Sequence, residues 1–307
     1  YTVSYNAMYG FPSAVFDHYY GYDTYYSYCS SNYVSLTFSN DRHEWINSLT
    51  VKLYHTQTME QPRYFVLKAR NDNDEWTILS TFSDLSWFEK GQAHTLYFQN
   101  NMAYHEYRFE NFATGDSFYC SWKLSTLDLG SVSTAMEIPH LAYDSMFIPK
   151  NLDMGKLYPN SEYYFDFQIS PPLPAGITLD PNLGIMFGAA STELPTTTFL
   201  ITASKLTGGT SSALFILTVQ DCVGDRSLIT LVVRTDNYPE ESYYSLYQGI
   251  GTNGTLIRSL DRLDTSTLNY VSLCLEHDLY TLELFFSDSI DRRNDAGYYL
   301  SVDDGEM

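Results

Sequence analysis

The stretch FQISPPLPAGITLDPNLGIMFGAA, residues 167–190, determines the fold of the middle of the chain. Pro171, Pro172 and Pro174 lack a backbone N–H, and each disfavours the helical region for the residue before it, so this stretch cannot be a helix. Gly176 suits a turn with a positive φ, and Ile177 and Leu179 restart an alternating pattern after it. The sequence DPNLG at 180–184 predicts a tight turn. We therefore expect a strand, an extended loop, a short strand, a turn and a further strand.

Motifs on both sides of this stretch resemble a known module. They are Tyr158-Pro159, Phe165-x-Phe167-x-Ile169, the PLPAGITLD run at 172–180, and the glycines at 184 and 188. Together they resemble the immunoglobulin-like module of secreted microbial and algal proteins, which is related to cadherin-like folds, over residues 136–222. The family usually has Gly-x-Pro at the second turn, where this chain has Gly188-Ala189-Ala190. The resemblance implies a non-catalytic spacer that holds other modules at a distance or stacks on them.

Alternation with a period of two extends over the rest of the chain. Apolar and polar residues alternate in segments such as NSLTVKLYH, RYFVLKAR, SALFILTVQ and LITLVVRT, and helical periodicity is nearly absent. Short strands separated by turn residues are typical of sandwiches and barrels. We expect an all-β protein with three tandem β-sandwich modules. They are a jelly roll at residues 1–133, an immunoglobulin-like module at 134–222 and a small β-sandwich at 223–307.

The first module carries the motifs of a ligand-binding jelly roll. The Ala-x-Phe-Asp motif at 14–17, the acidic turn and tryptophan at 71–76, and the aromatic-Arg-aromatic strand at 107–109 resemble the discoidin or coagulation-factor C-type family over residues 8–130. His18 replaces the glycine that usually follows the first aspartate. The resemblance implies a galactose-binding-like fold with ligand loops at one end of the barrel. The matching candidates for ligand contact are Tyr19, Tyr20, Tyr22, Tyr25, Tyr26, Trp45 and Trp87. The alternative is that the tyrosine rings plug the barrel end or pack on a neighbouring module.

The motifs of the third module match a known family less closely than those of the first two modules do. Its motifs are Tyr238–Glu241, Tyr244–Tyr247, Cys274-Leu275, Tyr280–Leu282 and Asp288-Ser289. They resemble a small β-sandwich found beside secreted modules. Asp288, Asp291 and Asp295 can supply oxygen ligands to calcium, whereas the two adjacent arginines at 292–293 favour a solvated turn. The NDNDE sequence at 71–75 lacks EF-hand spacing and predicts a hairpin turn. We expect no cofactor, with calcium as the open alternative.

Four cysteines, Cys29, Cys120, Cys222 and Cys274, allow three disulfide pairings. We expect Cys29–Cys120 and Cys222–Cys274, because sequential pairing keeps each bridge inside one segment of the chain. No C-x-x-C spacing is present, which disfavours a zinc ribbon or a thioredoxin-type site. Disulfides indicate an oxidising compartment, and the sequon at Asn253 lies in a predicted turn. The sequence therefore predicts an N-glycosylated protein that is secreted or displayed on the cell surface.

Charge and hydropathy exclude several kinds of partner. Acidic residues outnumber basic residues by 37 to 17, and the net charge of -20 repels nucleic acid phosphates and anionic lipid headgroups. The same charge attracts divalent cations and basic partners, or serves solubility alone.

No apolar run approaches the roughly 18 residues of a membrane span, so we expect no membrane insertion. No signal peptide is visible, which predicts a mature form or a fragment. The 28 tyrosines suit strands, glycan stacking and subunit contacts.

The sequence contains no recognisable catalytic motif. Its seven histidines are scattered, and the HExxH, GxSxG and Gly-rich phosphate-loop patterns are absent. The sequence leaves open a pair of catalytic carboxylates for glycoside hydrolysis, because the distance between the two groups in the folded protein decides whether they can act together. We expect a non-enzymatic extracellular structural or adhesive protein. It would be a subunit of a surface assembly or fibre, built by β contacts with copies of itself or other extracellular proteins.

The N-terminal YTVSYN is expected to be a strand lent to a neighbouring subunit. Two other functions fit the same modules. One is a carbohydrate-binding, lectin-like protein whose partners are glycans. The other is the accessory region of a larger secreted enzyme.

Overall fold

The computed structural model confirms that the protein is all-β. It describes residues 1–6, 8–9, 15–16, 25–28, 32–52, 61–72, 74–88, 92–114, 121–222, 224–234, 242–260, 268–286 and 297–303. Strands in this part of the chain form seven sheets, and the part contains no α-helix. Within the same ranges, no helix has the length and hydrophobicity of a membrane span.

The first module packs two main sheets around one aromatic core. The larger sheet has the order β1 (Thr2–Asn6), β4 (Tyr33–Thr37), β9 (Glu106–Thr114), β6 (Pro62–Arg70) and β7 (Thr77–Phe82). The facing sheet consists of β11 (Thr126–Gly130), β5 (Ser48–Lys52) and β8 (Ala93–Tyr97), and a third sheet of β10 (Ser121–Leu124), β3 (Tyr25–Tyr28) and β2 (Met8–Tyr9). Phe65, Phe109 and Phe112 of the larger sheet share this core with Leu49 and Leu96 of the facing sheet. β6 and β7 pair antiparallel on the two sides of the NDNDE sequence, where the sequence predicts a hairpin turn.

The second module forms from the stretch quoted at the outset and the strands around it. Its main sheet has the order β12 (Met146–Pro149), β17 (Thr210–Gln220), β16 (Leu194–Lys205) and β13 (Tyr164–Ser170), with β12 parallel to β17. A small hairpin consists of β14 (Ile177–Leu179) and β15 (Met186–Gly188). The order of strand, loop, short strand, turn and strand is therefore as predicted. Gly176 and Gly188 have φ values of 96° and 112°, a backbone region that residues with a Cβ rarely adopt.

The third module is a sandwich of two three-stranded sheets. One sheet has the order β21 (Leu268–Glu276), β18 (Arg226–Arg234) and β23 (Gly297–Asp303). The other has the order β20 (Thr255–Leu260), β19 (Ser242–Gln248) and β22 (Tyr280–Phe286). Alternate residues point between the sheets, as the period of two requires. These inward residues form a third hydrophobic cluster, which is separate from the clusters of the first two modules. The domain boundaries at 133 and 222 stay a prediction.

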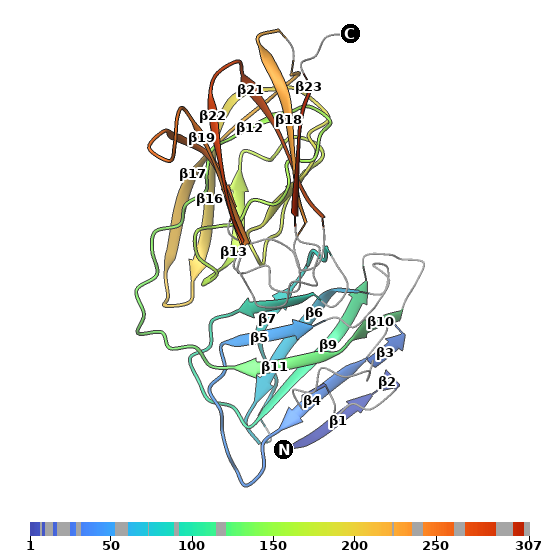
Figure 1. Cartoon of the computed structure of the whole chain (residues 1–307). Coiled ribbons are helices and arrows are strands. Elements are labelled where there is room, and N and C mark those ends of the chain that lie inside the picture. Colours follow the sequence, from blue (N-terminus) through green and yellow to red (C-terminus); the bar gives the residue numbers. More distant parts are fainter. Residues whose placement is uncertain are drawn as a thin grey trace.

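Figure 1 shows the first module below and the strands of the second and third modules above it. The second and third modules contact each other beside β12. Arg226 stacks on Phe147, with its Cζ 4.4 Å from the ring centroid. Arg258 is 1% exposed, and its guanidinium contacts the Met146 sulfur and donates to the Lys156 carbonyl at 3.2 Å. A side chain of β20 therefore anchors the third module on the second.

A disulfide joins Cys222, just after β17, to Cys274 in β21, which confirms one of the two predicted pairings. Cys29 and Cys120 lie outside the described residues, so their pairing stays a prediction. Their described neighbours Tyr28 and Ser121 face each other in the β3–β10 ladder, which favours it. Peptide mass spectrometry under non-reducing conditions would detect the second bridge.

Loss of the Cys222–Cys274 bridge is expected to lower the free energy of unfolding by about 2–4 kcal/mol, because the bridge closes a loop of 52 residues in the unfolded chain. Urea unfolding of Cys222→Ser, Cys274→Ser and the double variant measures the loss. All three variants should lose about the same amount, since each breaks the same bond. Additive losses in the double variant would contradict this explanation.

Candidate functional sites at the module junctions

The predicted jelly-roll site falls partly outside the described residues. Tyr19, Tyr20 and Tyr22 lie outside them. Tyr25 and Tyr26 lie in β3, whose backbone pairs with β10 on one side and β2 on the other. The role of these tyrosines as ligand contacts stays a prediction.

The structure does not bring Trp45 and Trp87 together. In the β5–β8 ladder, Ser48 faces Tyr97 at one end and Val51 faces His94 near the other. The Trp45 indole donates to the Asn100 carbonyl at 2.8 Å, three residues beyond Tyr97. The Trp87 indole donates to the Pro62 carbonyl at 2.9 Å, and its ring lies 4.5 Å from the His94 ring. The two tryptophans therefore lie towards opposite ends of this strand pair and do not form one platform.

The candidate metal and glycan-attachment positions differ in what the structure shows. Asp288, Asp291 and Asp295 lie outside the described residues. Within the described ranges, no group of three or more His, Cys, Asp or Glu side chains is arranged to hold a metal ion. Asn253 lies exposed in the turn between β19 and β20, as an accessible sequon requires.

A buried carboxylate joins the first module to the second. Asp180 lies in the DPNLG turn and is 0% exposed. Its Oδ1 accepts hydrogen bonds from the backbone N–H groups of Asn182 at 2.8 Å and Leu183 at 3.0 Å, as expected of an aspartate that opens a turn. Its Oδ2 accepts from the backbone N–H of Ser86 in the first module at 2.8 Å. The Asn182 amide also donates to the Ser83 carbonyl at 2.6 Å. One turn of the second module thus binds the loop at residues 83–88.

Ser86, His94 and Asp180 have the side chains of a catalytic triad but not its connections. His94 donates from Nε2 to the Ser86 carbonyl at 2.8 Å, and Asp180 accepts from the Ser86 N–H instead of from the imidazole. In a triad the histidine contacts the serine hydroxyl and the aspartate contacts the histidine. All three residues are buried, His94 at 6% exposure. We conclude that this cluster stabilises the junction.

Aromatic contacts extend this junction. Phe88 packs edge-on against Phe187 at 4.9 Å between ring centroids, and Tyr97 packs against Tyr163 at 5.3 Å. The Lys156 ammonium lies 4.1 Å from the Phe88 centroid. Contacts of this kind contribute about 0.5–1.5 kcal/mol each beyond their buried area. The first two modules are therefore fixed relative to each other by both polar and apolar contacts.

Burial lowers the pKa of His94 below its ordinary value of 6.5, although the Ser86 carbonyl and Asp180 oppose the shift. Below about pH 6.5 the unfolded chain takes up a proton at His94 that the folded chain does not, so we expect stability to fall as the pH falls. His94→Gln keeps a donor and cannot be protonated, and it should show a shallower dependence. The exposed His140 provides a control, since His140→Gln should keep the native slope. Urea midpoints between pH 5 and 8 measure these slopes, and parallel curves for His94→Gln and native protein would contradict the assignment.

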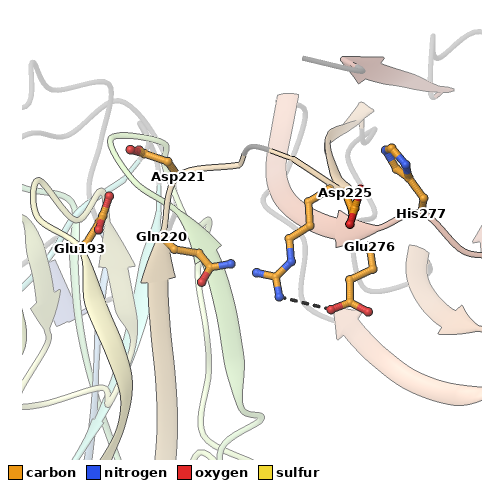
Figure 2. A pocket seen from close by; sticks show the side chains of 7 residues that line it. Glu193, Gln220, Asp221, Asp225, Glu276 and His277 are labelled. Atoms are coloured by element: carbon orange, nitrogen blue, oxygen red, sulfur yellow. Dashed lines mark hydrogen bonds and ion pairs between the residues drawn. The ribbon is translucent and has the colours of Figure 1, made fainter. Parts of the chain in front are cut away.

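A polar cleft of about 840 Å³ lies between the second and third modules (Figure 2). It is lined by Glu193, Gln220, Asp221, Asp225, Arg226, Glu276 and His277. Glu193, Gln220 and Asp221 come from the ends of β16 and β17 in the second module. The others come from the start of β18 and the end of β21 in the third, so both modules contribute to the site.

Ion pairs hold part of the cleft in place and leave it acidic. The Lys150 ammonium lies 3.0 Å from Asp221 and 3.5 Å from Glu193, and Arg226 lies 3.2 Å from Glu276. The hydrogen bond to Lys150 lowers the pKa of Asp221. A general acid needs a raised pKa, so Asp221 is unsuited to that role. Two cations face four carboxylates here, and the cleft keeps a negative charge.

Sequence reasoning missed this cleft, although one signal pointed to it. The predicted Cys222–Cys274 bridge brings two segments of the chain together. Those segments carry Asp221 and Asp225 on one side and Glu276 and His277 on the other. A disulfide between two polar segments therefore predicts that their charged side chains share one region of the surface.

The chain is similar to several solved domains, two of which are carbohydrate-binding modules. One is the family 32 module of NanJ from C. perfringens in complex with galactose, with 12% identity, a TM-score of 0.34, and coverage of 42% of this chain and 91% of that chain. Another is chitosan-binding module 1 of a chitosanase/glucanase from Paenibacillus sp. IK-5, with 12% identity, a TM-score of 0.34, and coverage of 42% and 94%. A third is the F5/8 type C domain of a Bacteroides fragilis protein, with 13% identity, a TM-score of 0.33, and coverage of 38% and 78%.

Among curated proteins, none matches the chain. Residues 148–220 match the family model described as "Putative Ig domain". This match lies within residues 136–222, where the sequence motifs resemble an immunoglobulin-like module. The immunoglobulin-like module predicted from motifs thus recurs in the comparison with family models.

Proposed function

We propose that this chain is a non-enzymatic extracellular protein that binds glycans in the cleft between its second and third modules. The main support for the proposal is the cleft. It is open, has a volume of about 840 Å³, and is lined almost entirely by side chains that can form hydrogen bonds. Ligand sites of small molecules occupy about 300–1,000 Å³. Carboxylates, an amide, a guanidinium and an imidazole together offer the acceptors and donors that adjacent sugar hydroxyls require.

The charge of the cleft selects among glycans. Four carboxylates and two cations leave it negative, on a chain whose net charge is -20. Uronic and sialic acids carry a negative charge and would be repelled, whereas amino sugars carry a positive charge and would be attracted. We expect the order of affinity to be amino-sugar oligomers, then neutral oligomers, then acidic oligomers.

Calorimetric titration with glucosamine, galactose and galacturonic acid oligomers, with and without calcium, tests the proposal. Asp221→Asn combined with Glu193→Gln should weaken binding of the amino-sugar oligomers at least tenfold and reduce the preference over neutral ones. Glu162→Gln, an exposed acid elsewhere in the second module, is the control and should bind as the native protein does. Absence of binding to all three oligomers would overturn the proposal.

Self-association is a second candidate function, favoured by an exposed apolar patch on the outer face of β16 and β17. Leu200 and Leu214 face each other across these strands, and Ile216 follows on the same side of β17. Leu214 is 68% exposed. The N-terminal strand does not support a strand exchange, because β1 pairs with β4 of its own chain. Contact through the sheet face is therefore the route to an assembly that we favour.

Light scattering over a range of protein concentrations tests self-association. Leu214→Glu should abolish any increase of mass with concentration, because it places a charge in the patch. Ile250→Glu, at an 81% exposed position of the third module, should leave the increase unchanged. A native protein that stays monomeric at about millimolar concentration would exclude this function.

A further inference from the structure

An apolar cavity of about 300 Å³ lies between the two sheets of the third module. Its walls are the inward residues of four strands, Ile229, Leu231, Tyr244, Leu246, Val271, Leu273, Leu275 and Leu282. These side chains are buried or half-buried, and the strand registers place them opposite one another. A cavity of about 150 Å³ lined by similar side chains can hold benzene, so this one has room for a roughly twofold larger apolar group.

Apart from Tyr244, the polar residues of the cavity lie at one end of it. This end is formed by the start of β18, the end of β21, the turn that follows β21 and the start of β22, which contribute Ser227, Glu276, His277, Asp278 and Tyr280. The β18–β21 register pairs Ser227 with Leu275. The next inward pair, Ile229 and Leu273, is apolar on both strands. His277 and Ser227 are joined by a hydrogen bond of 2.9 Å between Nε2 and Oγ. We call this end the mouth.

The far end contains one polar atom without a normal partner. Tyr244 is 1% exposed, and its hydroxyl makes no hydrogen bond of normal geometry among the described residues. Burial raises the pKa of this hydroxyl, while the nearby Arg258 guanidinium opposes the shift. Beyond the mouth, the cavity is therefore lined by apolar side chains and by the buried Tyr244.

The mouth is negatively charged and continuous with the acidic cleft. Glu276 and His277 line both the cavity and the cleft. Asp278 accepts from the Gln248 amide at 2.7 Å, and this hydrogen bond lowers the pKa of Asp278 and keeps it ionised. Arg226 forms an ion pair with Glu276 at 3.2 Å. A ligand whose apolar part fills the cavity would thus hold its other end among carboxylates.

We propose that the third module binds a cationic amphiphile, a single alkyl chain or small aromatic group in the cavity with an ammonium group at the mouth. The apolar walls supply affinity through the burial of hydrocarbon, and Glu276 and Asp278 select a positive charge over a negative one. The site shares Glu276 and His277 with the proposed glycan cleft, but its apolar walls do not line that cleft, so the dependence on chain length tests the cavity without the glycan contacts at Glu193 and Asp221.

Titration with alkyltrimethylammonium ions of increasing chain length, below their micelle concentrations, tests the proposal. Affinity should rise about fourfold for each added methylene and then reach a plateau when the chain fills the cavity. Decanol should bind more weakly, and decyl sulfate more weakly still. No binding, or equal binding of decyl sulfate and decyltrimethylammonium, would overturn the proposal.

Two variants locate the site, each with a matched control. Ile229→Phe reduces the cavity volume and should abolish the dependence on chain length, whereas Leu256→Phe, at an exposed position of β20, should not. Glu276→Gln should weaken decyltrimethylammonium binding severalfold and leave decanol binding unchanged. Glu283→Gln makes the same change of charge on an outward position of β22 and should have no effect. If both glutamate variants behave alike, the mouth does not select charge and the proposal fails.

Discussion

Replacing Asp180 with alanine is expected to lower the free energy of unfolding by about 5 kcal/mol. The buried carboxylate accepts hydrogen bonds from the backbone N–H groups of Ser86, Asn182 and Leu183. Alanine leaves these donors without an acceptor, and each unsatisfied buried donor costs about 1–3 kcal/mol. The Ser86 bond crosses from the second module to the first, so the variant should also loosen the junction. Urea unfolding measures the stability, and tryptophan fluorescence, to which Trp87 of the 83–88 loop contributes, reports on the junction.

Two further variants define what Asp180 contributes. Asp144→Ala removes an exposed acid from the same module and should change the free energy of unfolding by less than about 0.5 kcal/mol. Asp180→Asn keeps one acceptor oxygen and should recover part of the lost stability. If Asp180→Ala unfolds at the same urea concentration as the native protein, the carboxylate does not hold the junction.

Gly176→Ala is expected to lower the free energy of unfolding by about 4 kcal/mol, the second of the large effects. A Cβ at this position would lie 2.0 Å from the Ala189 carbonyl oxygen, and φ is 96°. The Gly176 carbonyl accepts the Ala189 N–H at 3.0 Å, so the backbone cannot move away without breaking the β14–β15 hairpin. Urea unfolding measures the loss, and circular dichroism checks that the variant folds.

Gly208 provides the matched control for Gly176. Its φ is 94°, but a Cβ there would meet nothing within 4 Å. Gly208→Ala therefore carries the conformational cost alone, about 1–2 kcal/mol. Equal losses at the two glycines would contradict the explanation by close approach of the backbone.

The sequence predicted those features of the backbone that depend on residues close together in the chain. Prolines without an N–H, a glycine at positive φ and an aspartate that opens a turn determine the backbone within a few residues. The run from β13 to β15 therefore has the predicted order of elements. The β6–β7 hairpin formed at residues 71–76 for the same reason, since Asp72 adopts a positive φ of 41°.

Contacts between distant segments could not be predicted in this way. The sequence predicts Asp180 as a turn residue. It does not predict that the second carboxylate oxygen accepts a hydrogen bond from the backbone N–H of Ser86, 94 residues away. The resemblance to the discoidin family predicts that Trp45 and Trp87 contribute to one ligand site, because the matching loops lie at one end of the jelly roll. The pairing of β5 with β8 separates them, and only the assembled sheet shows this. The apolar cavity depends likewise on how two sheets face each other.

The bridge between Cys222 and Cys274 has a mechanical consequence. It encloses β18, β19, β20 and most of β21, a span of 52 residues that could otherwise extend to about 180 Å under tension. A pull along the chain would pass through the two sulfur atoms and bypass this span. While the bridge is intact, the residues between Cys222 and Cys274 would therefore not extend under tension, and reduction of the bridge would make their length available.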